Sequence, residues 1–170
     1  MNKRIRQYIG LFSAIIAYYI IHEGAHFLYS LSIGAFKQIH FLGLGIQIDV
    51  YVDKMTQEQL GIFCLLGSVA TAITAYILIG CIPRIAKSNS KIFKACMYYI
   101  TLALLLLDPL YLSVLYSFFG GGDMNGIALL IPEITARIIY SVLFLIHLAI
   151  LFKVVIPRYT KTFHNNEADT

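Results

Sequence analysis

Two histidines and a glutamate fall within five residues of an apolar stretch, as His22-Glu23-Gly24-Ala25-His26. In a helix, residues i and i+4 lie one turn apart on the same face, so both imidazoles can reach one metal ion. Glu23 lies beside that face, where its carboxylate can take a proton from a metal-activated water and return it to a leaving amine. The spacing therefore predicts a zinc site inside a helix, with Glu23 as general base.

A catalytic zinc usually takes three protein ligands and keeps one position for water, so a third ligand must come from elsewhere in the chain. Asp123 lies in a glycine-rich break that can fold inward, and Asp108 lies within the same reach in the preceding apolar stretch. We expect His147 to be a packed or hydrogen-bonded histidine. The remaining candidates are weaker: Glu133, His40, Cys64, Cys81 and Cys96. The three cysteines are typical of small apolar packing residues.

The composition is that of a membrane protein. The chain has 170 residues, of which 59% are hydrophobic and 13% charged, whereas globular chains have roughly 45–50% and 25%. A soluble fold of this length cannot bury so much apolar surface, which excludes an ordinary cytosolic enzyme. The net charge of +4 predicts no nucleic-acid partner, because the basic residues flank apolar runs. We expect residues 1–170 to form a single polytopic membrane domain in contact with the lipid bilayer.

Four apolar stretches are each long enough to cross a bilayer, which takes about 20 residues in a helix. They cover residues 8–31, 60–82, 95–119 and 134–156. The second stretch is rich in small residues, which let helices approach closely in lipid, so we place it centrally. We expect Pro83 to end this second stretch, and the tail from about residue 160 is polar.

A change of period between the first two stretches predicts a strand. Ile46, Ile48, Val50 and Val52 alternate with polar residues, a period of two that is typical of a strand. Residues 38–41 precede it, with Gly43-Leu44-Gly45 as a turn. The predicted fold class is an all-α membrane protein with four transmembrane helices and a small interfacial β-hairpin between helices 1 and 2; an ordinary amphipathic loop is the alternative to the hairpin.

The charges predict the orientation. With four spans, both termini and the loop 83–94 share one side of the membrane. That side carries ten of the thirteen basic residues, namely Lys3, Arg4, Arg6, Arg84, Lys87, Lys91, Lys94, Lys153, Arg158 and Lys161. The positive-inside rule then predicts a multi-pass protein of the cell membrane, with both termini in the cytoplasm and the metal site nearer the outside.

These motifs resemble the site-2 protease family of intramembrane zinc metalloproteases. His22-Glu23-Gly24-Ala25-His26 matches the family's zinc-and-base motif, and Leu66-Gly67-Ser68-Val69-Ala70 resembles the small-residue stretch of its next helix. The family's second signature, N-P-x-D-G-like, is met in two separated parts: Asp108-Pro109 and Gly122-Asp123-Met124-Asn125-Gly126. This separation is longer than in the family. The resemblance covers about two thirds of the chain and implies a minimal member without accessory domains.

The resemblance implies a zinc endopeptidase that cleaves a membrane-spanning or membrane-associated protein or peptide. Its ligands would be His22, His26 and Asp123, with Asp108 as the alternative third ligand, and Glu23 would be catalytic. A helical substrate must unwind to expose its carbonyls, and an edge strand at Ile46, Ile48 and Val50 can hold it extended by main-chain pairing.

The alternative function is a non-proteolytic membrane metal binder, either a transporter or a sensor. Such a protein also needs histidines and acidic groups along a water path. Glu23 discriminates between the two, because a binder tolerates glutamine there and a protease does not. The sequence indicates neither the substrate nor the oligomeric state.

Overall fold

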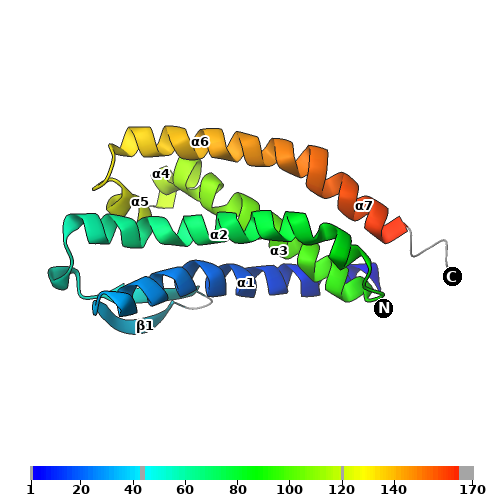
Figure 1. Ribbon diagram of the computed structural model, residues 1–170, viewed down its shortest axis with the longest axis horizontal. Helices are drawn as coiled ribbons and strands as arrows, with labels where there is room; N and C mark the ends of the chain where they lie inside the picture. Colours follow the sequence, from blue (N-terminus) through cyan, green and yellow to red (C-terminus); the bar gives the residue numbers. More distant parts are fainter. Residues whose placement is uncertain (1, 43–44, 120, 165–170) are drawn as a thin grey trace.

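The computed structural model describes residues 2–42, 45–119 and 121–164, and this part of the chain is mostly helical. Its long helices run along one axis, with the start of α1 and the end of α7 at one end and the strands and α5 at the other (Figure 1). The helices are α1 (Lys3–Ser32), α2 (Gln57–Ala86), α3 (Lys91–Leu110), α4 (Tyr116–Phe119), α5 (Gly122–Ile127), α6 (Glu133–Ile150) and α7 (Ile156–His164).

The described residues contain four helical segments long and apolar enough to cross a membrane: Lys3–Ser32, Gln57–Ala86, Lys91–Phe118 and Glu133–Thr162. Many of their large apolar side chains, such as Phe12, Ile77 and Leu145, are exposed. Exposed apolar surface on this scale needs lipid or another partner to cover it. The predicted class is thus confirmed at the level of a mostly helical chain with four apolar spans and a small hairpin.

The second span, α2, extends beyond its predicted end. It begins with a capping box, in which Thr56 accepts from the backbone N–H of Gln59 and the Gln59 side chain accepts from that of Thr56. Pro83 does not end it, because the helix continues to Ala86. Proline removes one helical hydrogen bond, but Ile82 and Ile85 on either side of it are buried and hold the last turn in place.

The third span changes its helical form where it approaches the site. Directly after Pro109, the α-helix α3 widens into a π-helix, η2 (Tyr111–Leu115), before α4. The predicted glycine break that follows is more ordered than expected, because Gly122–Ile127 forms the short helix α5. Gly121 has a φ of 153°, a backbone conformation that side chains disfavour, and it turns the chain into α5.

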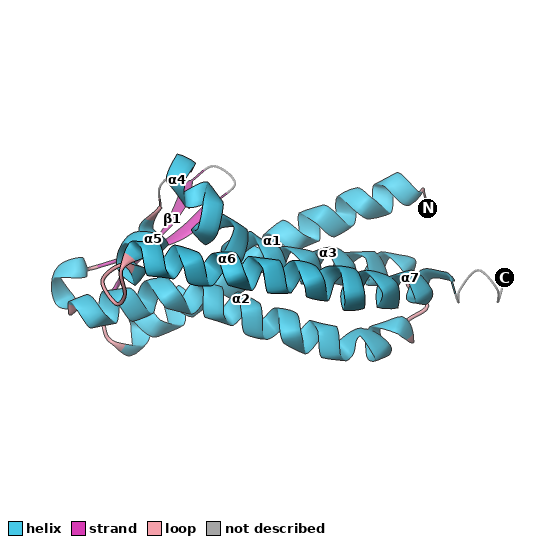
Figure 2. Ribbon diagram, turned by 90° about the horizontal axis from the view of Figure 1, so that it is seen from above, coloured by secondary structure: helices cyan, strands magenta, loops and turns pink. Residues whose placement is uncertain are grey.

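The predicted hairpin is present between α1 and α2 (Figure 2). Strand β1 (Phe36–Leu42) pairs antiparallel with β2 (Gly45–Val50). The apolar pair Ile39–Ile48 shares one face and the polar pair His40–Gln47 the other. The predicted strand ends earlier than expected, since Val52 begins the short 3-10 helix η1 (Val52–Lys54). Of the predicted turn, Gly45 belongs to β2, and residues 43–44 lie outside the described residues.

The fourth span continues as a helix into the segment that we expected to be a polar tail. After α6 comes a second π-helix, η3 (Leu151–Val155), and then α7 to His164. Tyr159 and Thr162 are buried, and the ammonium of Lys94 donates to the Thr162 carbonyl oxygen at 3.2 Å. These contacts with α3 explain why the chain stays helical past residue 160.

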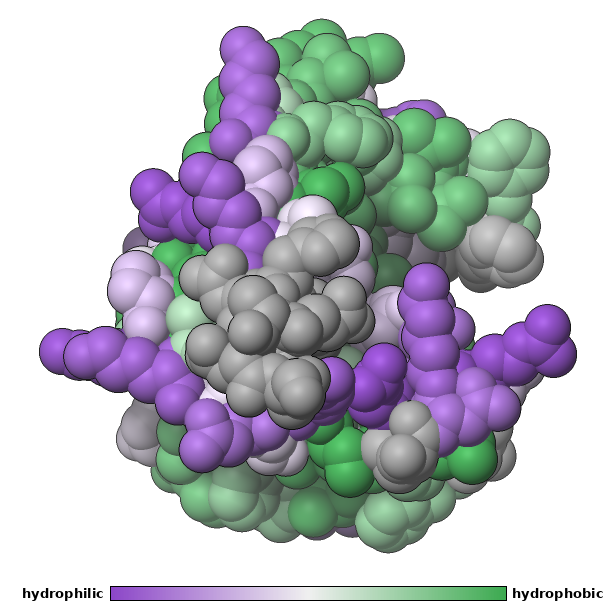
Figure 3. All heavy atoms as spheres, turned by 90° about the vertical axis from the view of Figure 1, so that its right-hand side faces the viewer, coloured by the Kyte–Doolittle hydropathy of each residue, from purple (hydrophilic) through white to green (hydrophobic). Residues whose placement is uncertain are grey.

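Polar side chains collect at the end of the bundle where α1 starts and α7 ends. Seen from that end, hydrophilic groups reach the left and right edges at mid-height, while apolar groups gather above and below them (Figure 3). The opposite end contains a buried apolar cluster, which joins Ile48 of the hairpin to Phe63, Leu112 and Met124. That cluster lies next to the histidines of α1 and fixes the elements that surround them.

Candidate metal centre

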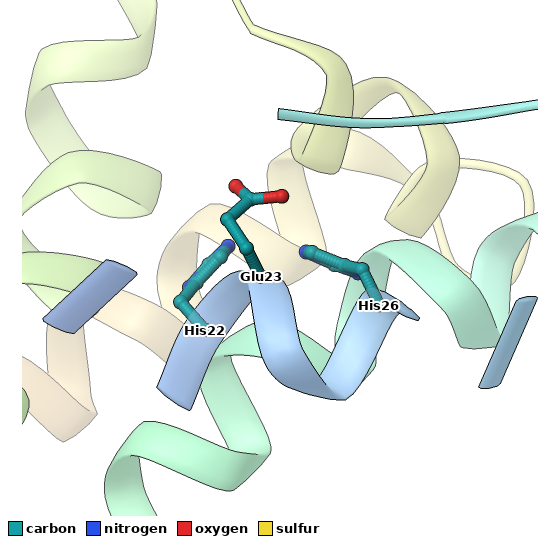
Figure 4. A group of neighbouring side chains, drawn as sticks. All are labelled: His22, Glu23 and His26. Atoms are coloured by element: carbon teal, nitrogen blue, oxygen red, sulfur yellow. The ribbon is translucent and has the colours of Figure 1, made fainter. Parts of the chain in front are cut away.

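The helix α1 presents His22, Glu23 and His26 together. Both histidines are buried, and their ring centroids lie 4.8 Å apart. Their ring nitrogens turn toward each other beneath the carboxylate of Glu23 (Figure 4). One possible ligand atom from each of the three residues lies within 4.8 Å of the others, so the cluster can hold a metal ion. The predicted one-turn spacing is therefore realised in the structure.

A glycine of α2 leaves room for this cluster. A Cβ added to Gly67 would lie 2.5 Å from His22 Nε2 and 2.6 Å from His26 Nε2. Real side chains cannot come so close, so only glycine lets α2 pack against both imidazoles. The sequence signal was the small-residue stretch around Gly67, which we interpreted only as close helix packing. The structure adds that this glycine faces the Nε2 atoms of both histidines.

Asp123 faces the same two nitrogens from α5. Its Oδ2 lies 3.0 Å from His22 Nε2, and its Oδ1 lies 3.6 Å from His26 Nε2. Burial alone would raise the pKa of the Asp123 carboxyl, but its contacts with His22 and His26 outweigh burial and hold the pKa below its ordinary range. An ionised carboxylate facing two imidazoles is a donor set that can hold a divalent metal ion.

Asp108 lies on the other side of His22. Its Oδ1 is 3.1 Å from His22 Nδ1 and accepts a hydrogen bond from the Tyr18 hydroxyl at 2.5 Å. The Thr71 hydroxyl donates to its Oδ2. The structure thus brings both candidate aspartates to the same imidazole, on opposite nitrogens. Asp108 is placed to orient the ring, as carboxylates behind metal-binding histidines commonly do.

His26 is oriented in the same way, by a backbone group. Its Nδ1 lies 2.7 Å from the Phe63 carbonyl oxygen, which fixes the ring and directs Nε2 toward Asp123. That Nε2 is buried and has no hydrogen-bond partner among the described residues. A buried polar atom without a partner is costly, and a metal ion between His22, His26 and Asp123 would satisfy it. The residues present therefore fit a bound metal.

Glu23 points from α1 toward the hairpin. Its Oε2 accepts the backbone N–H of Ile48 at 3.0 Å. Two cavities of about 380 and 430 Å³ adjoin it, and both are also lined by Gly122 and Asp123. The site is thus open to small groups on both sides of the Glu23 carboxylate.

The other candidates of the sequence lie elsewhere or have different partners. His147 is buried, with Nδ1 2.6 Å from the Leu105 carbonyl oxygen and Nε2 2.8 Å from the Tyr76 hydroxyl, as expected of a packed histidine.

His40 lies in β1 next to Asp49, and Glu133 pairs with Arg137. Of the free cysteines, Cys64 borders the cavity that contains Asp123.

Sequence reasoning missed three groups around the site: the Tyr18 hydroxyl, the Thr71 hydroxyl and the Phe63 carbonyl. Tyr18 precedes His22 by four residues and so lies on the same helical face, which is a signal that could have indicated it. Thr71 and Phe63 carry no such signal, because their roles depend on how α2 packs against α1 and α3.

The fold and the site together define a chain with four apolar spans and a buried histidine–carboxylate cluster that can hold a metal. No protein-family model, no curated protein and no solved structure matches the chain. The resemblance to the site-2 protease family therefore stays a prediction from the sequence motifs around His22, Gly67, Asp108 and Asp123.

Proposed function

We propose that this protein is an intramembrane zinc metalloprotease, an endopeptidase that hydrolyses a peptide bond of a membrane-spanning or membrane-associated substrate. The observation that carries the proposal is the convergence of His22, His26 and Asp123 next to Glu23, with the buried His26 Nε2 lacking a partner among the described residues. Two histidines and a carboxylate are a ligand set of catalytic zinc sites.

Zinc, when bound, supplies a Lewis acid that polarises a carbonyl and lowers the pKa of water from 15.7 to about 7. His22, His26 and Asp123 would hold it, and Asp108 and the Phe63 carbonyl would keep the two rings in place. A carboxylate oxygen of Glu23 lies within 4.8 Å of a ring nitrogen of each histidine, and Glu23 would accept a proton from water and return it to the leaving amine. These are the roles that the H-E-x-x-H spacing suits.

The substrate would lie extended along β2. Ile46, Ile48 and Val50 belong to this strand, and the two cavities next to Glu23 are lined by its residues. Pairing with a strand edge holds a peptide by main-chain hydrogen bonds, which suits a substrate that has lost its own helical bonds.

The hydrogen bond between Glu23 and Ile48 favours a protease over a transporter or sensor. A metal binder needs no base held against a strand edge. The test uses Glu23→Gln with a membrane-spanning test substrate. We expect the variant to keep its zinc and to lose cleavage by roughly 100-fold or more, the contribution of a general base. Full cleavage by Glu23→Gln would exclude the assigned base.

We further propose that both termini lie in the cytoplasm and that the metal centre is nearer the outside. Asp53 in η1 and Asn89 in the loop between α2 and α3 are both exposed, and the apolar span α2 separates them along the chain. In a background without the three native cysteines, Asp53→Cys should react with an impermeant maleimide in intact cells and Asn89→Cys should not. The reverse pattern would place the site near the cytoplasmic face.

A further inference from the structure

The outer edge of β2 faces the candidate metal centre. The Ile48 N–H donates to Glu23 Oε2, whereas the Tyr51 N–H donates back to the Ala35 carbonyl oxygen beside β1. Successive N–H groups of an antiparallel strand point to opposite sides. The N–H groups of Ile46, Ile48 and Val50 therefore point away from β1, and those of the residues between them point toward it.

The two cavities lie one after the other along this outer edge. The cavity of about 430 Å³ borders Gly45, Ile46 and Gln47, and that of about 380 Å³ continues past Ile48 to Val50. Both reach Glu23, whose carboxylate is bonded to the edge between them at Ile48. A peptide in these cavities would run along β2 and pass Glu23 at its middle.

We propose that the Ile48 amide is a positioning group that fixes Glu23 and thereby sets the register of the substrate. The inference rests on the proposed function and goes beyond it. The substrate strand pairs with the N–H groups of Ile46 and Val50, on either side of Glu23. The peptide carbonyl opposite Ile48 finds no N–H on β2 and is the one presented to the metal centre.

The relative strength of the hydrogen bonds supports the assignment of the Ile48 N–H to Glu23 and of the Ile46 and Val50 N–H groups to the substrate. A hydrogen bond to a carboxylate is roughly twice as strong as one between neutral groups, so a substrate carbonyl competes poorly with Glu23 for the Ile48 N–H. Ile48 itself is buried, which keeps water from taking the place of the carboxylate. A carboxylate has about four acceptor sites, so the bond to Ile48 leaves Glu23 able to accept a proton.

The first test is amide hydrogen exchange of the zinc-loaded protein without substrate. In Glu23→Ala the Ile48 amide should exchange about 10- to 100-fold faster than in the parent, as expected for the loss of a bond to a charged group. Glu23→Gln is the matched control, because its side-chain oxygen still accepts, and it should change the rate much less. The amides of Gln47 and Asp49, which face β1, should stay protected in all three and show that the hairpin is intact. An unchanged Ile48 rate in Glu23→Ala would overturn the proposal.

The second test separates positioning from substrate pairing with three proline variants. Proline is tolerated at a strand edge where the N–H faces away from the partner strand. Ile48→Pro should lower kcat by about 10- to 100-fold and leave KM and zinc content unchanged, because a displaced base loses part of its contribution. Ile46→Pro and Val50→Pro should instead raise KM by about 3- to 10-fold, the effect of one lost main-chain hydrogen bond.

The outcomes distinguish this proposal from the proposed function. If Ile48→Pro raises KM like its neighbours and leaves kcat unchanged, the substrate pairs at Ile48 and the positioning role is wrong, although the protein is still a protease. If the zinc-loaded parent cleaves nothing, the proposed function fails and the substrate register fails with it. The exchange rates still decide whether Ile48 holds Glu23.

Discussion

The described residues include two buried histidines in different regions of the bundle, His26 and His147. Their environments differ in whether both ring nitrogens have a hydrogen-bond partner. His26 and His147 are each only 2% exposed. Both nitrogens of His147 have partners, the Leu105 carbonyl and the Tyr76 hydroxyl. His26 has the Phe63 carbonyl on Nδ1, but its Nε2 has no hydrogen-bond partner in the described part of the chain and faces Asp123. Burial alone therefore does not distinguish the two histidines. They differ in that His26 has an open nitrogen facing a carboxylate, an arrangement that a bound metal ion would satisfy.

The strongest way to break this comparison is to remove the carboxylate that faces the open nitrogen. Asp123→Asn keeps the shape but removes the anionic oxygen that zinc prefers, so we expect zinc affinity to fall by more than about 100-fold and cleavage to be lost. Asp108→Asn is the matched variant on the other nitrogen of His22. It should still bind zinc, with an affinity lowered by about 10- to 100-fold at most, as is usual for groups that orient a metal-binding side chain.

Both affinities can be measured by competition with a chromophoric chelator. If Asp108→Asn loses zinc and Asp123→Asn keeps it, the two aspartates have been assigned the wrong way round.

A methyl group next to the open nitrogens provides a second test. Gly67→Ala places a Cβ about 2.5 Å from the Nε2 atoms of both histidines, so the rings must move apart and zinc affinity should fall at least about tenfold. Gly80→Ala in the same helix is the control, because a Cβ there meets nothing within 4 Å. Equal zinc affinity in the two variants would show that α2 does not limit the space at the site.

The smallest effect on metal binding is expected at His147. His147→Ala leaves the Leu105 carbonyl and the Tyr76 hydroxyl without their partner, which should lower the free energy of unfolding by about 1–3 kcal/mol. Thermal unfolding in detergent measures this loss. Zinc content should not change, and a parallel loss of zinc would mean that the two histidine regions are coupled.

The local parts of the site could be predicted from the sequence. The spacing of His22 and His26 determines that they share a helical face, and the alternation around Ile48 determines which side chains share a strand face. Neither feature depends on how the helices pack. The four apolar spans were predictable for the same reason, since length and composition are properties of single segments.

The parts that depend on packing were not predictable. The sequence leaves both Asp108 and Asp123 as candidates for the third ligand. Only the packing of α3 and α5 places one of them at each ring nitrogen of His22. The helix α2 continues past its predicted end because buried Ile82 and Ile85 outweigh the lost hydrogen bond at Pro83. The bond from Ile48 to Glu23 joins residues 25 positions apart, and no local pattern encodes it.

The most direct test of the central claim is the zinc content per chain of the purified protein, His26→Ala and His147→Ala, measured side by side by elemental analysis. We predict about one zinc per chain in the parent and in His147→Ala, and almost none in His26→Ala, because the proposed site would then lack one of its three ligands. Full zinc occupancy in His26→Ala would contradict the account, since the metal would then be held without the nitrogen on which the site is built.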